Sequence, residues 1–213
     1  MRDSAIMAAM ARAAALAGAV GIRANGPADV AAIRAAVALP IIGIDKRPDL
    51  EPEAYITPNL ACVEGLVRAG ASVVAIDATL RPRRGAAATS DAATLIAQIR
   101  EAFPDTVVMA DIATLAEGVA AAAAGADLVA TTLSGYTADS PSLPGPDVDL
   151  IAALVRSQDR PVVAEGRIST PDDLRAAFAA GATAVVVGTA ITDPLGIARR
   201  FVVATPRRLA AAG

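Results

Sequence analysis

Residues 68–74 read RAGASVV, and close variants of this stretch recur as LAGAVGI at 16–22, AAGADLV at 123–129 and AAGATAV at 179–185. In each copy an Ala-rich segment ends at a glycine, and an apolar run follows. A glycine at this point typically ends a helix in a left-handed conformation before the chain enters a strand. The glycines, at positions 18, 70, 125 and 181, are 52, 55 and 56 residues apart, about two helix–strand units each. This spacing predicts an internally repetitive fold in which helices and strands alternate.

Seven apolar runs are candidate strands, at residues 19–24, 40–46, 72–79, 106–112, 128–133, 161–166 and 184–190. Continuous apolar runs of this length are typical of strands buried on both faces, as in parallel sheets covered by helices. Seven of them alternating with helices indicate either a (β/α) barrel or a doubly wound sheet. Prolines that follow Gly, Thr or Asp predict the first turns of five helices, at positions 27, 58, 146, 171 and 194.

Length and composition favour a compact α/β protein. A single α/β domain commonly reaches 213 residues, so we expect one domain over residues 1–213. Hydrophobic residues make up 54% of the chain and aromatic ones only 2%, so Ala, Val, Ile and Leu must build the core. The formal net charge of -3 leaves no basic face for nucleic acid.

Two residue types exclude whole classes of site. Histidine is absent and Cys62 is the only cysteine, so the chain cannot assemble a His/Cys metal site, a Ser-His triad or an internal disulfide. The apolar stretch 5–20 is interrupted by Arg12, so we interpret it as a helix of the fold rather than a signal peptide. We therefore expect a cytoplasmic protein with no nucleic-acid or membrane partner.

Polar residues gather at one end of the candidate strands. In a parallel barrel these carboxyl ends meet on a single face, where barrel enzymes place their chemistry. A polar residue also ends a buried strand simply because the chain is leaving the core, and this alternative applies to Arg23, Asp77 and Asp111. The full set is Arg23, Asp45, Lys46, Asp77, Asp111, Thr131, Thr132, Glu165, Arg167, Gly188 and Thr189.

Lys46 is the only lysine in a chain with eighteen arginines, and it directly follows the apolar run PIIGID. It could be a solvated cation at the end of a strand. Arginine keeps its proton near neutral pH, whereas a desolvated lysine can act as a base, an acid or a Schiff-base nucleophile. Because arginine meets the other cationic needs of this chain, we favour a chemical role for Lys46.

Glu165 directly follows the buried run PVVA. Burial of a carboxylate raises its pKa toward the range that is useful for general acid–base catalysis. The alternative is a structural ion pair with Arg167 or Arg23.

Two features near these residues predict binding. The turns EGRIS (165–169) and VVGTAI (186–191) supply glycines and backbone N–H groups after the last two strands, the usual phosphate position in barrels. Residues 134–147, SGYTADSPSLPGPD, form the one long irregular segment. Such a loop inside a compact domain is usually functional, so we interpret it as a candidate lid.

Eight motifs in the same order resemble those of bacterial N-acetylmannosamine-6-phosphate 2-epimerases. The resemblance extends over about residues 6 to 203, and TTLSGYT and AEGRI are its most specific parts. The motifs are GIRANG, PIIGIDKR, YITP, AIDATLRPR, MADI, TTLSGYT, AEGRISTP and VVVGTAIT.

This resemblance implies a phosphate-binding (β/α)8 TIM-type barrel of sialic acid catabolism that interconverts N-acetylmannosamine 6-phosphate and N-acetylglucosamine 6-phosphate. It implies no cofactor and no metal. Separately from the resemblance, the sequence leaves a homodimer as the assembly to test. Lys46 and Glu165 would be the acid–base groups at carbon 2. Arg23 and Asp111 would orient the substrate. The phosphate would lie in turns formed by Gly166, Arg167, Gly188 and Thr189.

The chain departs from the family pattern in two places. Only MRDSA precedes the first helix, where the family has a further strand, so the sequence supplies seven strands of the expected eight. In GTAITDP, Thr189 and Asp193 stand where a second glycine and an arginine are expected. Asp193 would either weaken phosphate binding or cap the helix that begins at Pro194.

Two other functions fit the same residues. One is a Schiff-base aldolase or lyase with Lys46 as the covalent nucleophile. The other is a non-catalytic, degenerate phosphosugar-binding barrel, which the shortened start of the chain suggests.

Overall fold

The computed structural model describes residues 3–50, 53–83 and 91–205. Its seven strands form one parallel sheet in sequential order, and each strand pairs with the next along the chain. The strands are β1 Ile22–Asn25, β2 Ile41–Ile44, β3 Val73–Asp77, β4 Val107–Asp111, β5 Leu128–Ala130, β6 Val162–Ala164 and β7 Ala184–Val185. Six of the seven lie within the predicted runs, and β1 extends one residue beyond its run, to Asn25. The sequential order of the parallel strands confirms the barrel alternative over the doubly wound sheet, whose strand order reverses.

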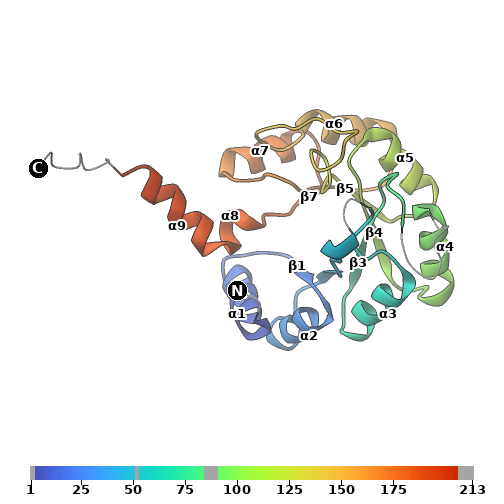
Figure 1. Ribbon diagram of the computed structural model, residues 1–213, viewed down its shortest axis with the longest axis horizontal. Helices are drawn as coiled ribbons and strands as arrows, with labels where there is room; N and C mark the ends of the chain where they lie inside the picture. The colour runs from blue at the N-terminus through green and yellow to red at the C-terminus, as the bar shows by residue number, and fades with distance from the viewer. Residues whose placement is uncertain (1–2, 51–52, 84–90, 206–213) are drawn as a thin grey trace, which may run out of the picture.

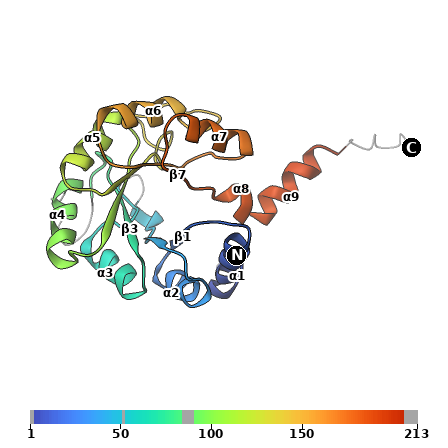
Figure 2. The same ribbon diagram turned by 180° about the vertical axis from the view of Figure 1, so that it is seen from behind.

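The helices are α1 Ser4–Leu16, α2 Pro27–Ala36, α3 Leu60–Arg68, α4 Ala92–Ala102, α5 Leu115–Ala123, α6 Val148–Ser157, α7 Pro171–Ala179, α8 Thr189–Thr192 and α9 Pro194–Val203, with a short 3₁₀ turn at Pro48–Leu50. Helices α1 to α7 surround the curled sheet, whereas α8 and α9 follow β7 and α9 leads away from it (Figures 1 and 2). In the described ranges, no helix has both the length and the apolar character needed to span a membrane.

The glycine turns behave as the repeated sequence predicts. Gly18, Gly70, Gly125 and Gly181 have φ between 95° and 100°, and each follows the last helical turn before a strand. This left-handed conformation reverses the chain at the amino end of the barrel.

The predicted helix starts are correct in three of five cases. Prolines 27, 171 and 194 are the first residues of α2, α7 and α9. Helices α3 and α6 begin two residues after their prolines, because the side chains of Asn59 and Asp147 accept the capping hydrogen bonds. The predicted strand 184–190 is likewise too long, since α8 begins at Thr189.

The core is divided between the two faces of the sheet. Along β3, Val74 and Ile76 pack outward against the helices, whereas Ala75 belongs to a smaller cluster that fills the barrel interior. This alternation follows from the two-residue period of a strand. The interior cluster comprises Ile44, Ile56, Ala75, Met109, Ala113, Ala130, Leu133 and Val163.

The same alternation determines which strand-end residues enter the barrel. The barrel interior contains one residue near the end of each of four strands, namely Ile44, Met109, Ala130 and Val163. Continuing the two-residue period of the strand places the residues two positions further on at the same inward side. Those residues are Lys46, Asp111, Thr132 and Glu165.

Candidate active site

A buried guanidinium joins the first strand to the fourth and the sixth. Arg23, in β1, donates two hydrogen bonds to the Asp111 carboxylate, at 3.1 and 2.6 Å. Its Nη1 also lies 3.1 Å from Oε2 of Glu165. The side chains of Arg23, Asp111 and Glu165 are 7%, 0% and 19% exposed. Of the two partners that the sequence offered for Glu165, the observed ion pair is the one with Arg23.

The charges of this triad act on one another. Burial alone would lower the pKa of Arg23, but Asp111 and Glu165 outweigh it and leave that pKa above its ordinary value. For Glu165 the largest effect is burial, which raises the pKa. Arg23, the Thr132 hydroxyl and Lys46 favour the ionised form, whereas Asp111 opposes it, and the net shift is upward. The predicted rise in the pKa of Glu165 is therefore confirmed.

Two adjacent threonines hold Glu165. The Thr131 hydroxyl lies between the backbone N–H and C=O of Glu165, at 3.1 and 2.9 Å. The Thr132 hydroxyl lies 2.8 Å from Oδ1 of Asp111 and 3.2 Å from Oε2 of Glu165. One hydroxyl has one proton to donate, so Thr132 serves one carboxylate at a time. Its oxygen can accept a hydrogen bond from the other carboxyl group once that group is protonated.

Lys46 follows β2 and lies at the entrance of the barrel, where it is exposed. Its backbone N–H donates to Oδ1 of Asn25 at 2.9 Å, and an isolated antiparallel bridge pairs it with Ile56. These contacts tie the lysine backbone to the end of β1 and to the segment before α3. The backbone of Lys46 is therefore held in a fixed position at the mouth of the barrel, and its ammonium group extends from there.

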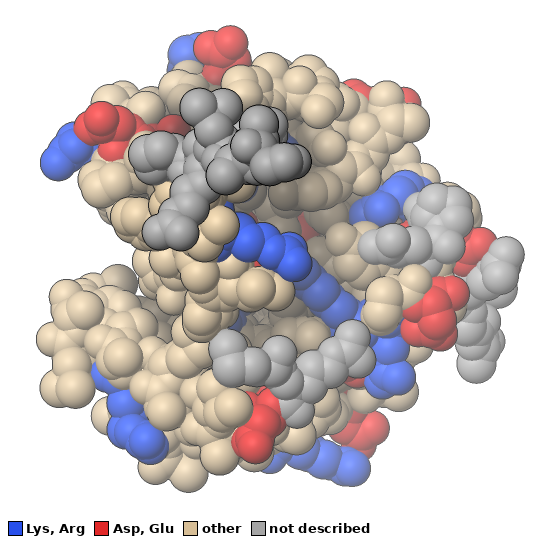
Figure 3. All heavy atoms as spheres, turned by 60° about the vertical axis from the view of Figure 1, so that its left-hand side comes forward, with Lys and Arg blue, Asp and Glu red and all other residues tan. Residues whose placement is uncertain are grey.

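Lys46 and Glu165 line one cavity of about 500 Å³, a volume in the usual range for small-molecule sites. All four residues predicted to form the phosphate turns line it too, namely Gly166, Arg167, Gly188 and Thr189. Arg23 and Asp111 are not part of the lining and lie behind Glu165. In the space-filling view, Lys and Arg side chains run across the hollowed centre of one face of the molecule (Figure 3).

The charges of this lining are mixed. Its cations are Lys46, Arg167 and Arg200, and its carboxylates are Glu165 and Asp193. Asp193 occupies the N-cap position of α9, but its side chain makes no capping hydrogen bond to any described residue. Asp193 therefore stands at the predicted cap position without forming the capping hydrogen bond, and it is one of the residues that line the cavity.

Arg167 has contacts that the sequence did not predict. Its Nε donates to the carbonyl oxygen of Gly145 at 2.8 Å, and its Nη1 donates to that of Ser134 at 2.5 Å. The guanidinium also lies 5.6 Å from the ring centre of Tyr136. Arg167 thus reaches into the irregular segment 134–147, which contains no helix or strand, as expected.

The remaining strand-end carboxylates organise local turns. Asp77 is fully buried and accepts hydrogen bonds from the Thr79 hydroxyl at 2.6 Å and from Nη2 of Arg81, also at 2.6 Å. Asp45 accepts from Nη2 of Arg47 at 2.7 Å. Across the described parts of the chain, no three His, Cys, Asp or Glu side chains are grouped so as to hold a metal ion.

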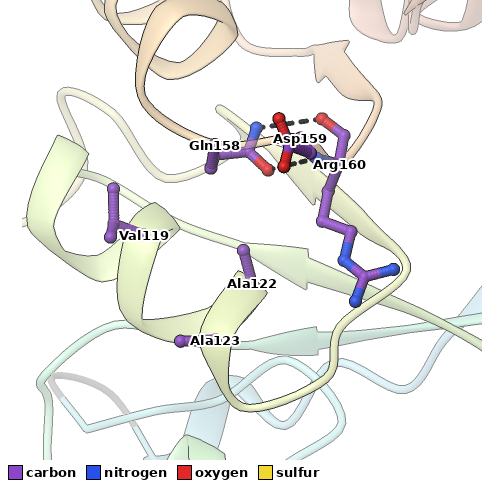
Figure 4. A pocket seen from close by; sticks show the side chains of 6 residues that line it. All are labelled: Val119, Ala122, Ala123, Gln158, Asp159 and Arg160. Atoms are coloured by element: carbon purple, nitrogen blue, oxygen red, sulfur yellow. Dashed lines mark hydrogen bonds between the residues drawn. The ribbon is translucent and has the colours of Figure 1, made fainter.

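A second depression, of about 520 Å³, has no comparable chemistry (Figure 4). It lies between the end of α5 and the loop before β6, at the amino ends of the strands. The amide of Gln158 is hydrogen-bonded to the backbone of Arg160 in both directions. Its lining is Val119, Ala122, Ala123, Gln158, Asp159 and Arg160.

Sequence reasoning missed four residues of the site. Asn25 positions Lys46, and Tyr55, Tyr136 and Arg200 line the cavity. Tyr55 and Tyr136 are the only tyrosines in the chain, which is a signal that composition could have provided. Asn25 shares the inward alternation of Arg23, so strand periodicity could have found it.

The sequence matches a known family over nearly its whole length. The family described as "Putative N-acetylmannosamine-6-phosphate epimerase" matches residues 7–207. The chain belongs to this family. A relative from Caldanaerobacter subterraneus subsp. tengcongensis, named "Putative N-acetylmannosamine-6-phosphate 2-epimerase", is 49% identical over 197 residues, which are 92% of this chain and 82% of the relative.

Two further members of the epimerase family support the assignment. A protein of the same name from Cutibacterium acnes is 46% identical over 203 residues, covering 94% of this chain and 86% of that protein. The solved structure of the N-acetylmannosamine-6-phosphate 2-epimerase from Clostridium perfringens superimposes with a TM-score of 0.87 at 41% identity, covering 94% of this chain and 86% of that one. The family resemblance and the TIM-type barrel fold are therefore confirmed.

Proposed function

We propose that this protein is a cofactor-independent isomerase that interconverts N-acetylmannosamine 6-phosphate and N-acetylglucosamine 6-phosphate. The observation that carries the proposal is the presence of the Glu165 carboxylate and Lys46 in the lining of one cavity. Membership of the epimerase family favours this reaction over a Schiff-base aldolase and over a non-catalytic barrel.

The chemistry requires two proton-carrying groups. Inverting carbon 2 of the ring-opened sugar means removing the proton beside the carbonyl and returning one to the opposite face. Lys46 and Glu165 come from different strands and can address the two faces, whereas one group alone would tend to restore the original configuration. The lysine also stabilises the oxyanion that develops between the two proton transfers.

Arg23 and Asp111 assist through Glu165. Their ion pair lies behind Glu165 and holds its carboxylate in place. Through Glu165, Arg23 and Asp111 would thus orient the reacting end of the substrate. When Glu165 takes a proton, it can donate that hydrogen to the Thr132 oxygen, and the threonine hydroxyl then donates to Asp111. The triad therefore accepts both protonation states of Glu165 without losing its hydrogen bonds.

The phosphate group lies at the turns that follow β6 and β7. Gly166 and Arg167 provide one turn, and Gly188 and Thr189 provide the other. Arg200 adds a cation on the same wall, which offsets the carboxylate of Asp193. Because Asp193 lines the cavity, phosphate affinity here depends on the balance of these two charges.

The exposed surface of α9 supports a homodimer as the assembly. This helix projects away from the barrel (Figure 1), and all its residues are at least partly exposed. Phe201, Val202 and Val203 are 74%, 66% and 85% exposed. An apolar surface of this kind favours burial against a second copy. Light scattering of the purified protein should give the dimer mass, and Phe201→Glu should reduce it to the monomer mass.

A coupled assay with N-acetylmannosamine 6-phosphate tests the proposed reaction. We expect product formation by the parent protein and none above background by Lys46→Arg, because arginine keeps the charge but cannot exchange a proton. Arg175→Lys changes an exposed arginine on α7 and should retain parental activity. Near-parental turnover by Lys46→Arg would exclude the acid–base role of this lysine.

A further inference from the structure

Residues 134–147 form a loop whose two ends are joined at the base. The Ser134 hydroxyl donates to Oδ2 of Asp147 at 2.6 Å, and both residues are buried. Asp147 also caps α6 through its other carboxylate oxygen. Compact surface loops with adjacent ends of this kind are frequently functional. The loop therefore begins and ends at a buried anchor.

Arg167 ties the same two ends together from the neighbouring β6 turn. Its Nε and Nη1 donate to the carbonyls of Gly145 and Ser134, which lie at opposite ends of the loop. A planar guanidinium has donors in a rigid fork and can hold two carbonyls at once. A lysine ammonium is a single point charge and cannot reproduce this geometry.

Backbone conformations on both sides of the contact are adapted to the guanidinium. Arg167 has φ 55°, a left-handed conformation that is unfavourable for a non-glycine residue. Gly135 has φ 81°, and a Cβ at this position would lie 2.4 Å from Nη1 of Arg167. The positive φ favours glycine there, and a side chain at this position would require the Arg167 guanidinium to move. The loop is thus shaped around the Arg167 side chain.

The guanidinium also reaches the part of the loop that faces the cavity. It lies 5.6 Å from the ring centre of Tyr136, an arrangement that attracts a cation to an aromatic face. Tyr136 and Arg167 both line the cavity that contains Lys46 and Glu165. The contacts of Arg167 therefore set the position of Tyr136 on the cavity wall.

We propose that Arg167 is a positioning residue that pins the loop 134–147 and holds Tyr136 against the cavity. The pinning is a property of the free protein, and its effect on turnover rests on the proposed epimerase function. This role differs from direct phosphate binding by the Arg167 side chain, because two of its donors are engaged by loop carbonyls.

Hydrogen exchange of the substrate-free protein tests the pinning. In Arg167→Lys we expect the amides of residues 134–147 to exchange about tenfold faster or more, as loss of charged hydrogen bonds favours opening. The amides of β4 serve as an internal reference for global stability. Arg175→Lys, at an exposed ion pair with Asp172 on α7, is the matched control and should leave loop exchange unchanged. Equal loop exchange in the Arg167 and Arg175 variants would overturn the proposal.

Gly135→Ala provides a second test that retains every donor of Arg167. The added methyl group should displace the guanidinium, so loop exchange and the loss of kcat/KM should follow those of Arg167→Lys. If Arg167→Lys loses activity while Gly135→Ala keeps it, the arginine acts directly on the substrate and the positioning role is wrong. If the parent protein has no epimerase activity, the proposed function fails, but the exchange experiment still decides the pinning.

Discussion

Replacing Arg23 with methionine should destabilise the protein in a pH-dependent way. The substitution keeps much of the side-chain volume and removes the cation that lies between Asp111 and Glu165. Breaking a buried ion pair by removing one partner typically costs about 3–5 kcal/mol, because the other charge stays buried. For a domain of this size each kcal/mol lowers Tm by about 2–4 °C, so we expect a loss of roughly 6–20 °C near neutral pH.

The direction of the pH dependence follows from Glu165. Burial already raises its pKa, and removing Arg23 raises that pKa further because the guanidinium favours the ionised form. A carboxyl group whose folded-state pKa lies above its unfolded value destabilises the protein as pH rises from the unfolded value through the folded one. The penalty of Arg23→Met should therefore be larger at pH 8 than at pH 5.

Thermal denaturation followed by circular dichroism at both pH values measures this penalty. The control is Arg68→Met, the same substitution in an exposed pair with Glu64 on α3. Exposed pairs contribute about 0–1 kcal/mol, so the control should melt within a few degrees of the parent. The reasoning is refuted if the two variants melt together at pH 8, or if the Arg23 variant loses more stability at pH 5 than at pH 8.

Three further outcomes are expected. Thr132→Val should move the acidic limb of the kcat–pH profile to higher pH, since the hydroxyl favours ionised Glu165; an unshifted limb in the variant would contradict this. Cys62 should resist alkylation at pH 8 in the folded protein and react after denaturation, because burial raises its pKa to about 11 and leaves about one thiol in a thousand ionised. Gly118→Ala should cost about 1–3 kcal/mol in denaturant unfolding, because the new Cβ would lie 2.3 Å from Cδ2 of Leu154; an unchanged midpoint would mean that Leu154 moves aside freely.

Local signals in the sequence were sufficient for the order of elements. Apolar runs and glycine turns predicted all seven strands, because each signal depends only on neighbouring residues. The predicted helix starts were wrong where a proline and a capping side chain compete for the first turn. Pro58 and Pro146 resemble first helical residues, but the side chains of Asn59 and Asp147 cap the helices later. Which cap forms depends on the tertiary path of the chain.

The site was predictable as a set of residues but not as a set of contacts. Chain order and strand ends brought Lys46 and Glu165 to one cavity, together with both predicted turns. Sequence could not choose between Arg23 and Arg167 as the partner of Glu165, because Arg23 has an inward position in β1 and Arg167 lies only two residues beyond Glu165. That choice depends on the loop 134–147, whose carbonyls occupy Arg167.

The triad of Arg23, Asp111 and Glu165 has a consequence for the energetics of the proposed intermediate. With both carboxylates ionised, its formal charge is one negative unit. In the direction of the proposed reaction in which Glu165 takes the carbon-bound proton of the sugar, that unit would move from the protein to the substrate as an enolate. The total charge inside the barrel is then unchanged, and only its location moves. Because the charge changes place, the groups that stabilise it at each end must already be oriented, and Lys46 in the cavity lining is a cation on the substrate side.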